Sequence, residues 1–330
     1  MTFDVLIIGQ GLAGSLVASA MEDRGFTFLI YDEIRPHSSS QYAAGLINPI
    51  TGRRFVKSWQ YDLLEPVFNT TYASLGAKYN TTFIRDLTIR LCLSGAKEEN
   101  DLLSQSVRYG YDHLISRCNH LDDITKNIYV QYDLKAYQVD IIHLISILRN
   151  QWLSGNQLIQ SSFNYSDLFF DTANKCWKYH DHVFRAVIFC EGAAVKDNPF
   201  FYDLPVLPNK GQMLWIDLNL PEHLAYKHQV MLIGHQRIGW VGATYEWDFD
   251  TPLPTVEGLN DLKYKLDRFI DVPYRVISQH SGIRPTTQDR RPIIMQHPHL
   301  ANMWAINGMG TKGASVGPYL INELMSQLKI

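Results

Sequence analysis

The part of this chain that most constrains its fold is residues 4–32. Residues 5–8 are an apolar run rich in β-branched side chains, which is typical of a strand buried on both faces. The run leads into GQGLAG at residues 9–14, and apolar side chains then recur at helical spacing as far as Gly25. A second apolar run ends at Asp32. Strand, glycine-rich turn, helix, strand and acid in this order predict a dinucleotide-binding βαβ unit.

Each member of this pattern has a physical role. Gly9 allows the tight turn, Gly11 lets a pyrophosphate approach the backbone, and Gly14 lets the helix pack closely on the strand. Free N–H groups and the positive end of the helix dipole then face the phosphates. An acid at position 32 accepts hydrogen bonds from a ribose diol and repels a 2′-phosphate. An ordinary loop is the alternative, and it leaves the flanking elements unexplained. The predicted cofactor-binding residues here are Gly9, Gly11, Leu12, Ala13, Gly14, Asp32 and Glu33.

Length and composition narrow the class of protein. The 330 residues are enough for one large domain or two of ordinary size, and 46% of them are hydrophobic, so a substantial core is expected. The net charge of −3 gives no support for binding to nucleic acid or to an anionic membrane. No stretch approaches roughly 18 uninterrupted apolar residues, so no membrane span is predicted.

The cysteines favour a reducing compartment. They form no C-x-x-C pair and no zinc-binding spacing, so no metal site is predicted; they are Cys92, Cys118, Cys176 and Cys190. Scattered reduced thiols are typical of the cytoplasm, which is the expected location.

Several glycine-rich segments suggest that backbone lies close to a ligand. Ala43, Ala44 and Gly45 permit a large flat group to lie against the chain, although a plain surface turn is the alternative. Gly192 directly follows a buried strand predicted at residues 183–189. Residues 307–313, NGMGTKG, form a glycine turn into the last helix. The basic and aromatic residues 52–59 are either a substrate contact or a solvated loop.

These pieces together resemble the D-amino-acid-oxidase-like FAD-dependent oxidoreductases, the group of glycine oxidase, sarcosine oxidase and D-amino acid oxidase, and they follow one another in the same order as in that family. Besides the N-terminal pattern, the resemblance lies in S-x-x-A-A-G at residues 40–45, K-G-Q at 210–212 and G-A-T at 242–244. The most specific match is G-x-R-P-x-T-x-D-x-x-P at residues 282–292.

The resemblance implies an α/β fold in which an FAD-binding Rossmann-like domain is combined with a discontinuous mixed-sheet substrate domain. The FAD-binding domain would take residues 1–75, 135–205 and 275–330. The substrate domain would take residues 76–134 and 206–274.

The resemblance also implies roles for single residues. Arg284 would bind the substrate carboxylate; the alternatives are a salt bridge to Asp289 or a surface position. The C-terminal turn would face the flavin N1–C2 side, with Lys312 either adding positive charge there or simply solvated. Tyr245 would compensate for a family tyrosine that is missing near residues 231–233. The expected catalytic residues are Arg284, Lys312 and Tyr245, and the further cofactor-binding residues are Ala43, Ala44, Gly45, Gly192, Gly308, Gly310, Thr311, Lys312 and Gly313.

The function implied is FAD-dependent oxidation of a small amine or amino acid, with hydride passing from the α-carbon to flavin N5 and an imine as product. One alternative is a dehydrogenase that uses an acceptor other than oxygen. Another is FAD-dependent demodification of the tRNA wobble uridine, because residues 307–318 also resemble the FAD domain of the bifunctional tRNA wobble-uridine modification enzyme. The negative charge argues against nucleic acid as a partner. A non-enzymatic FAD-binding protein is the last alternative.

Overall fold

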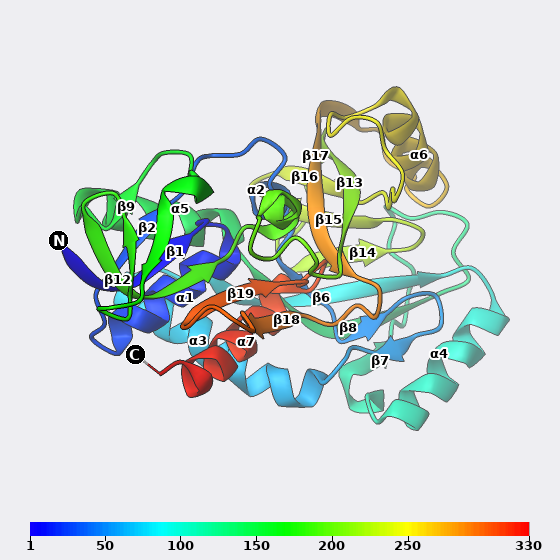
Figure 1. Cartoon of the computed structure of the whole chain (residues 1–330). Coiled ribbons are helices and arrows are strands. Elements are labelled where there is room, and N and C mark those ends of the chain that lie inside the picture. Colours follow the sequence, from blue (N-terminus) through cyan, green and yellow to red (C-terminus); the bar gives the residue numbers. More distant parts are fainter. Residues whose placement is uncertain (330) are drawn as a thin grey trace.

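The chain folds around two large β-sheets that lie side by side (Figure 1). The structure is a computed structural model, and it describes residues 1–329. The predicted α/β class is confirmed. Among these residues no helix is both long and apolar enough to cross a membrane.

The first sheet has eight strands and contains the N-terminal βαβ unit. β1 is parallel to β2 on one side and to β12 on the other, and β12 is also parallel to β19. The order is β10-β11-β12-β1-β2-β9, with β19 on β12 and β18 on β19. The strands are β1 (Thr2–Ile8), β2 (Phe28–Tyr31), β9 (Leu158–Ile159), β10 (Leu168–Asp171), β11 (Cys176–Tyr179), β12 (His182–Phe189), β18 (Ile293–Gln296) and β19 (Met303–Asn307).

Successive residues of β1 point to opposite faces of this sheet, and both faces are covered. Val5 and Ile7 belong to a core cluster that includes buried residues of four helices, whereas Leu6 and Ile8 belong to a second cluster with Phe201, against which Phe163 packs. This explains why the strand is apolar without alternation. The helices are α1 (Leu12–Asp23), α3 (Tyr61–Lys78), α5 (Ile141–Ser154) and α7 (Gly313–Gln327).

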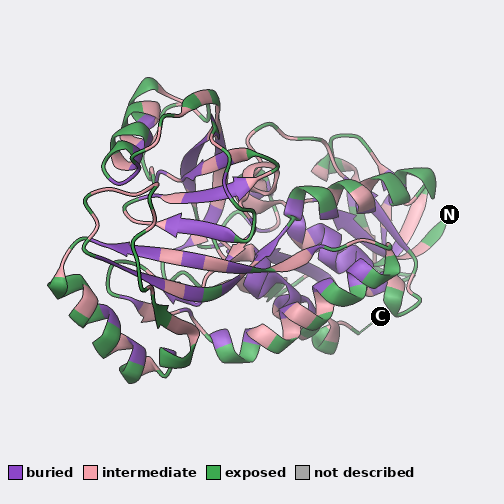
Figure 2. Ribbon diagram, turned by 180° about the vertical axis from the view of Figure 1, so that it is seen from behind, coloured by how far each residue is buried: buried purple, intermediate pink, exposed green. Residues whose placement is uncertain are grey.

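The second sheet has nine strands in the order β17-β13-β16-β15-β14-β6-β8-β3, with β7 on β8. One face packs on α4 (Ala96–Tyr109) and the small hairpin of β4 (Ile50–Thr51) and β5 (Val56–Lys57), and the other packs on α6 (Val256–Asp267). Buried residues follow the strands of both sheets in Figure 2, and exposed residues follow the outer sides of the helices. The strands are β3 (Leu46–Ile47), β6 (Ile84–Leu93), β7 (Ile115–Arg117), β8 (Val130–Val139), β13 (Val206–Asp217), β14 (Leu224–Lys227), β15 (Met231–His235), β16 (Ile238–Gly242) and β17 (Arg275–Thr287).

Segments from both sheets meet near β17. The short helix α2 (Ser39–Tyr42) packs on this strand, and Gly310 donates a backbone hydrogen bond of 2.9 Å to the Pro285 carbonyl. β17 lies within a segment expected in the FAD-binding domain, yet it pairs with β13 of the second sheet. The division of the chain into the two domains stays a prediction.

Candidate cofactor and substrate site

The glycine turn after β1 depends on the absence of side chains. Gly9 has a φ of +95°, and a Cβ there would lie 2.6 Å from the Cys190 carbonyl oxygen. A Cβ on Gly14 would lie 1.9 Å from the Gly9 carbonyl oxygen, so α1 packs this closely on the turn only with glycine. The turn therefore has the geometry that its sequence predicts.

The N-terminus of α1 offers free hydrogen-bond donors. The Leu12 N–H donates to Ser40 Oγ at 3.2 Å. The N–H groups of Ala13 and Gly14 make no hydrogen bond to any described residue. Unsatisfied donors at the positive end of a helix dipole fit a pyrophosphate.

Asp32 has a partner that the motif does not indicate. Its Oδ1 accepts a hydrogen bond of 2.8 Å from the Gln10 N–H, and its Oδ2 accepts one of 2.6 Å from Nη1 of Arg149, on α5. A carboxylate has about four acceptor positions, so capacity remains for a ribose diol. Glu33 points elsewhere and pairs with Arg35 at 2.7 Å.

The segment of small residues is packed and is not a plain surface turn. Gly45 is buried with a φ of +64°, and a Cβ there would lie 1.7 Å from the Val139 carbonyl oxygen. The Ala44 carbonyl accepts a hydrogen bond of 2.8 Å from the Gln138 side chain, and Ala43 is partly buried. Small side chains here let the chain pass tightly from α2 into β3.

The C-terminal turn lies beside the N-terminal one. Gly308 and Gly310 have φ values of +72° and +53°, which favour glycine. A Cβ on Gly313 would lie 3.2 Å from Leu12 Cδ2, so α7 begins next to the beginning of α1. The positive ends of the two helix dipoles therefore converge on one region.

Thr311 and Lys312 of the C-terminal turn differ in exposure, and Asn307 links the turn to β12. Thr311 is exposed, whereas Lys312 is partly buried and has no ion-pair partner within residues 1–329. Burial lowers the pKa of Lys312, and the charge of Arg290 lowers it further. The Gly192 carbonyl accepts a hydrogen bond of 2.9 Å from the Asn307 side chain, which ties the end of β12 to the turn.

Arg284 extends its guanidinium over Gly211. A Cβ on Gly211 would lie 2.0 Å from Arg284 Nη2, so the glycine of K-G-Q makes room for the guanidinium. Nη1 donates to Asn209 Oδ1 at 2.7 Å and to the Thr244 carbonyl at 3.1 Å. The guanidinium carbon lies 4.6 Å from the centre of the Tyr245 ring.

No carboxylate of the described residues neutralises Arg284. Within the described residues it forms no ion pair, and Asp289 instead accepts a hydrogen bond of 3.0 Å from the Arg291 N–H. The alternative salt bridge between Arg284 and Asp289 is therefore wrong. Burial lowers the pKa of Arg284, opposed by Tyr245 and Glu246. The Nε and Nη2 groups make no hydrogen bond to a described residue and are available to a ligand.

The remaining candidate side chains lie at the surface. Tyr245 is 64% exposed although its ring covers one side of Arg284. Residues 52–59 include the second strand of the β4–β5 hairpin, with Phe55 buried and the side chains of Arg53 and Arg54 exposed at its tip. No group of three or more potential metal ligands occurs in the part of the chain that the structure describes.

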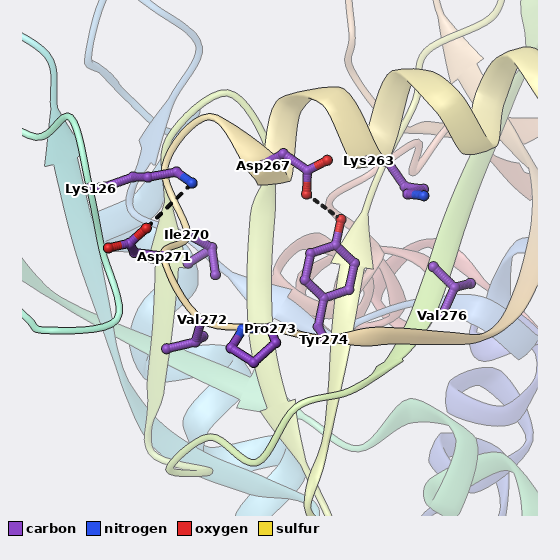
Figure 3. Close-up of a pocket in the computed structure, with 9 residues that line it drawn as sticks. All are labelled: Lys126, Lys263, Asp267, Ile270, Asp271, Val272, Pro273, Tyr274 and Val276. Atoms are coloured by element: carbon purple, nitrogen blue, oxygen red, sulfur yellow. Dashed lines mark hydrogen bonds and ion pairs between the residues drawn. The ribbon is translucent and has the colours of Figure 1, made fainter.

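A hollow of ≈ 440 Å³ lies elsewhere, between α6 and the start of β17 (Figure 3). Lys126 pairs there with Asp271 at 3.5 Å, and Tyr274 donates a hydrogen bond to Asp267. None of the predicted site residues lines it. Its charged groups largely satisfy one another, so we do not place the site there.

Comparison with known proteins agrees with this geometry. Residues 166–327 match the model of the family DAO, described as FAD dependent oxidoreductase. The fold is similar to that of glycine oxidase from Geobacillus kaustophilus, with a TM-score of 0.80 and 18% identity over 99% of this chain and 94% of that one. It is similar to iminodiacetate oxidase from Chelativorans sp. BNC1, with a TM-score of 0.72 and 18% identity over 96% and 93%. L-proline dehydrogenase from P. horikoshii has a TM-score of 0.73 and 12% identity over 99% and 94%. At these identities the likeness to solved structures establishes the fold.

Proposed function

Because residues 166–327 of this chain match the DAO family of FAD-dependent oxidoreductases, we propose that it oxidises a small amine or amino acid that carries a carboxylate. This match confirms the predicted resemblance, and with it FAD as the cofactor. The identity of the substrate is the part that we propose.

The unneutralised guanidinium of Arg284 carries this proposal. It is held by Asn209 and the Thr244 carbonyl through Nη1 alone, which leaves Nε and Nη2 free. A planar guanidinium with free donors suits a bidentate grip on a carboxylate. A carboxylate bound there would supply the negative charge that the buried Arg284 guanidinium lacks.

The residues around the two glycine turns fit FAD. The free N–H groups of Ala13 and Gly14 would hold the pyrophosphate, and Asp32 would accept from the ribose. The beginning of α7, with Lys312, would face the flavin and favour the negative charge of its reduced form. Bound FAD supplies the chemistry, since it accepts the hydride that the substrate α-carbon loses. Arg284 then contributes by orienting that carbon.

The experiment compares matched amines. Holoprotein is mixed anaerobically with glycine, sarcosine, methylamine or dimethylamine, and bleaching of the flavin absorbance is followed. We expect bleaching by amines with a carboxylate and little by the amines without one. Equal rates with sarcosine and dimethylamine contradict the proposal. Admission of air afterwards separates an oxidase, whose colour returns rapidly, from a dehydrogenase.

A tRNA with carboxymethylaminomethyl-uridine serves as a further arm of the same experiment. This nucleoside carries the same glycine-like group, so Arg284 suits it chemically. Faster bleaching by this tRNA than by every free amine would indicate that the substrate is RNA and not a small molecule.

A further inference from the structure

We propose that Glu246 is a positioning residue for Arg284, and that the buried ammonium of Lys210 holds Glu246 in place. The pair would thereby set how tightly the substrate carboxylate binds. This inference rests on the proposed function, since it gives Arg284 the carboxylate-binding role.

Residues 244–246 follow β16 and run along β13. The backbones of Lys210 and Glu246 exchange two hydrogen bonds, each of 2.9 Å. Thr244 presents its carbonyl to Arg284 at 3.1 Å, and Tyr245 covers the guanidinium with its ring. This short segment thus supplies two of the three groups that hold Arg284.

The third group depends on the same segment. Asn209 accepts from Arg284 Nη1 at 2.7 Å through Oδ1. Its Nδ2 donates to the Glu246 carbonyl at 3.1 Å. Asn209 therefore links the backbone of Glu246 to the guanidinium. A displacement of Glu246 would disturb all three groups that hold Arg284, namely the Thr244 carbonyl, the Tyr245 ring and Asn209.

The Glu246 carboxylate is fastened on the other face of β13. Lys210 and Gln212 alternate with Gly211, so their side chains point away from the face that carries the guanidinium. Glu246 Oε1 accepts from Gln212 Nε2 at 2.7 Å and from Thr244 Oγ1 at 2.6 Å. Glu246 Oε2 lies 3.3 Å from Lys210 Nζ. The segment is therefore clamped from one face while it supports Arg284 on the other.

The burial of Lys210 explains why the Glu246 carboxylate has to stay in this position. Its side chain is 0% exposed, and Nζ makes no hydrogen bond within residues 1–329. A buried ammonium without a counter-charge is unfavourable, so Lys210 requires the Glu246 carboxylate beside it. Burial by itself would raise the pKa of Glu246, but the hydrogen bonds from Thr244 and Gln212 and the charge of Lys210 lower it. Glu246 is therefore ionised and paired with Lys210.

The test measures anion binding separately from turnover. Acetate is titrated into the holoenzyme of the wild type and of Glu246→Ala, Glu246→Gln, Lys210→Met and the double variant Lys210→Met/Glu246→Gln, and the flavin absorbance reports binding. We expect each single variant to weaken acetate binding about tenfold, a typical loss for one hydrogen bond to a charged group. The double variant leaves no unpaired charge, and we expect it to recover most of the affinity.

The controls separate positioning from general damage. Glu222→Ala removes an exposed carboxylate that pairs with Arg85 at 2.8 Å, and should leave acetate binding unchanged. FAD content should stay at the wild-type value in the single variants, while KM for the carboxylated substrate rises. Should Glu246→Ala fail to fold, Glu246→Gln carries the test.

Two outcomes overturn the inference in different ways. Acetate binding that is lost in Arg284→Met but unchanged in the Glu246 variants refutes the positioning role and leaves the proposed function standing. Acetate binding that is unchanged in Arg284→Met refutes the proposed function, and the inference falls with it.

Discussion

The Arg149 guanidinium donates a hydrogen bond of 2.6 Å to the Asp32 carboxylate, although the two residues are 117 positions apart in the chain. Both side chains are largely buried, with 13% and 14% of their surface exposed. Arg149 Nη1 also donates to Gln10 Oε1 at 2.7 Å. Asp32, the acid at the end of the βαβ unit, is thus bonded to α5 as well as to the glycine turn.

This ion pair decides how Asp32 should be tested. Asp32→Ala leaves a largely buried arginine unpaired, so it alters stability as well as cofactor binding. Asp32→Asn keeps the shape and one acceptor oxygen, but it also leaves Arg149 without a counter-charge. We expect it to weaken FAD binding by about 1.5–3 kcal/mol, the range for hydrogen bonds to charged groups. Titration of apoprotein with FAD measures the change, and unaltered affinity would mean that Asp32 does not contact the cofactor.

The close packing of the glycine turn gives a prediction about stability. Gly14→Ala places a Cβ 1.9 Å from the Gly9 carbonyl oxygen, so backbone has to move. We expect a loss of about 3 kcal/mol in the free energy of unfolding, the upper end for overpacking. Gly95→Ala is the matched control, because its φ is −177° and a Cβ there has nothing within 4 Å. Denaturant titration of the two variants should show a large and a small change, respectively, the small one because Gly95 is the N-cap of α4, where glycine is preferred to alanine.

The structural features that the sequence predicted most accurately are those that depend on residues close together in the chain. Gly14 has to be glycine because of the Gly9 carbonyl five residues before it, and that need is visible in the motif, whereas the side chain excluded at Gly9 would meet Cys190 at the end of β12. The pairs Arg149–Asp32 and Lys210–Glu246 were missed, because each joins elements that only the tertiary fold brings together. Arg149 had no signal of its own, since a charged residue in an amphipathic helix is ordinarily solvated. Lys210 and Glu246 each lie in a recognised motif or beside one, K-G-Q and G-A-T, but their contact depends on how β13 and β16 pair.

Lys227 gives a prediction about pH. It lies on β14 and has no ion-pair partner in the described part of the chain, and burial lowers its pKa to about 8. Between pH 8 and about 10.4, the usual lysine pKa, the unfolded chain carries a proton that the folded chain has lost. The contribution of this group to the free energy of unfolding therefore rises with pH across that window.

Lys227→Met tests the sign of this effect. At pH 7 we expect the variant to be more stable than the wild type by up to about 3 kcal/mol, since each pKa unit corresponds to about 1.4 kcal/mol. The difference should shrink as the pH rises above 8. Denaturant titrations of both proteins at pH 7, 8 and 9.5 measure it. A constant difference at all three pH values means that Lys227 titrates normally.

The last prediction concerns Arg284. Arg284→Met should leave FAD bound, because the guanidinium contacts Asn209, Thr244 and Tyr245 and none of the residues predicted to hold the cofactor. Anaerobic reduction of the flavin by a carboxylated amine should slow by a factor of about 100 or more, since the grip sets both affinity and alignment. Arg284→Lys should restore only part of the rate, because an ammonium keeps the charge and loses the planar fork. Arg275→Met is the matched control, since Arg275 lies on the same strand and its side chain is 80% exposed. Reduction by an amine without a carboxylate should be slow in the wild type and change little in Arg284→Met. Equal rates for the wild type and Arg284→Met with the best carboxylated amine contradict the assignment, and loss of FAD from the variant would make Arg284 structural.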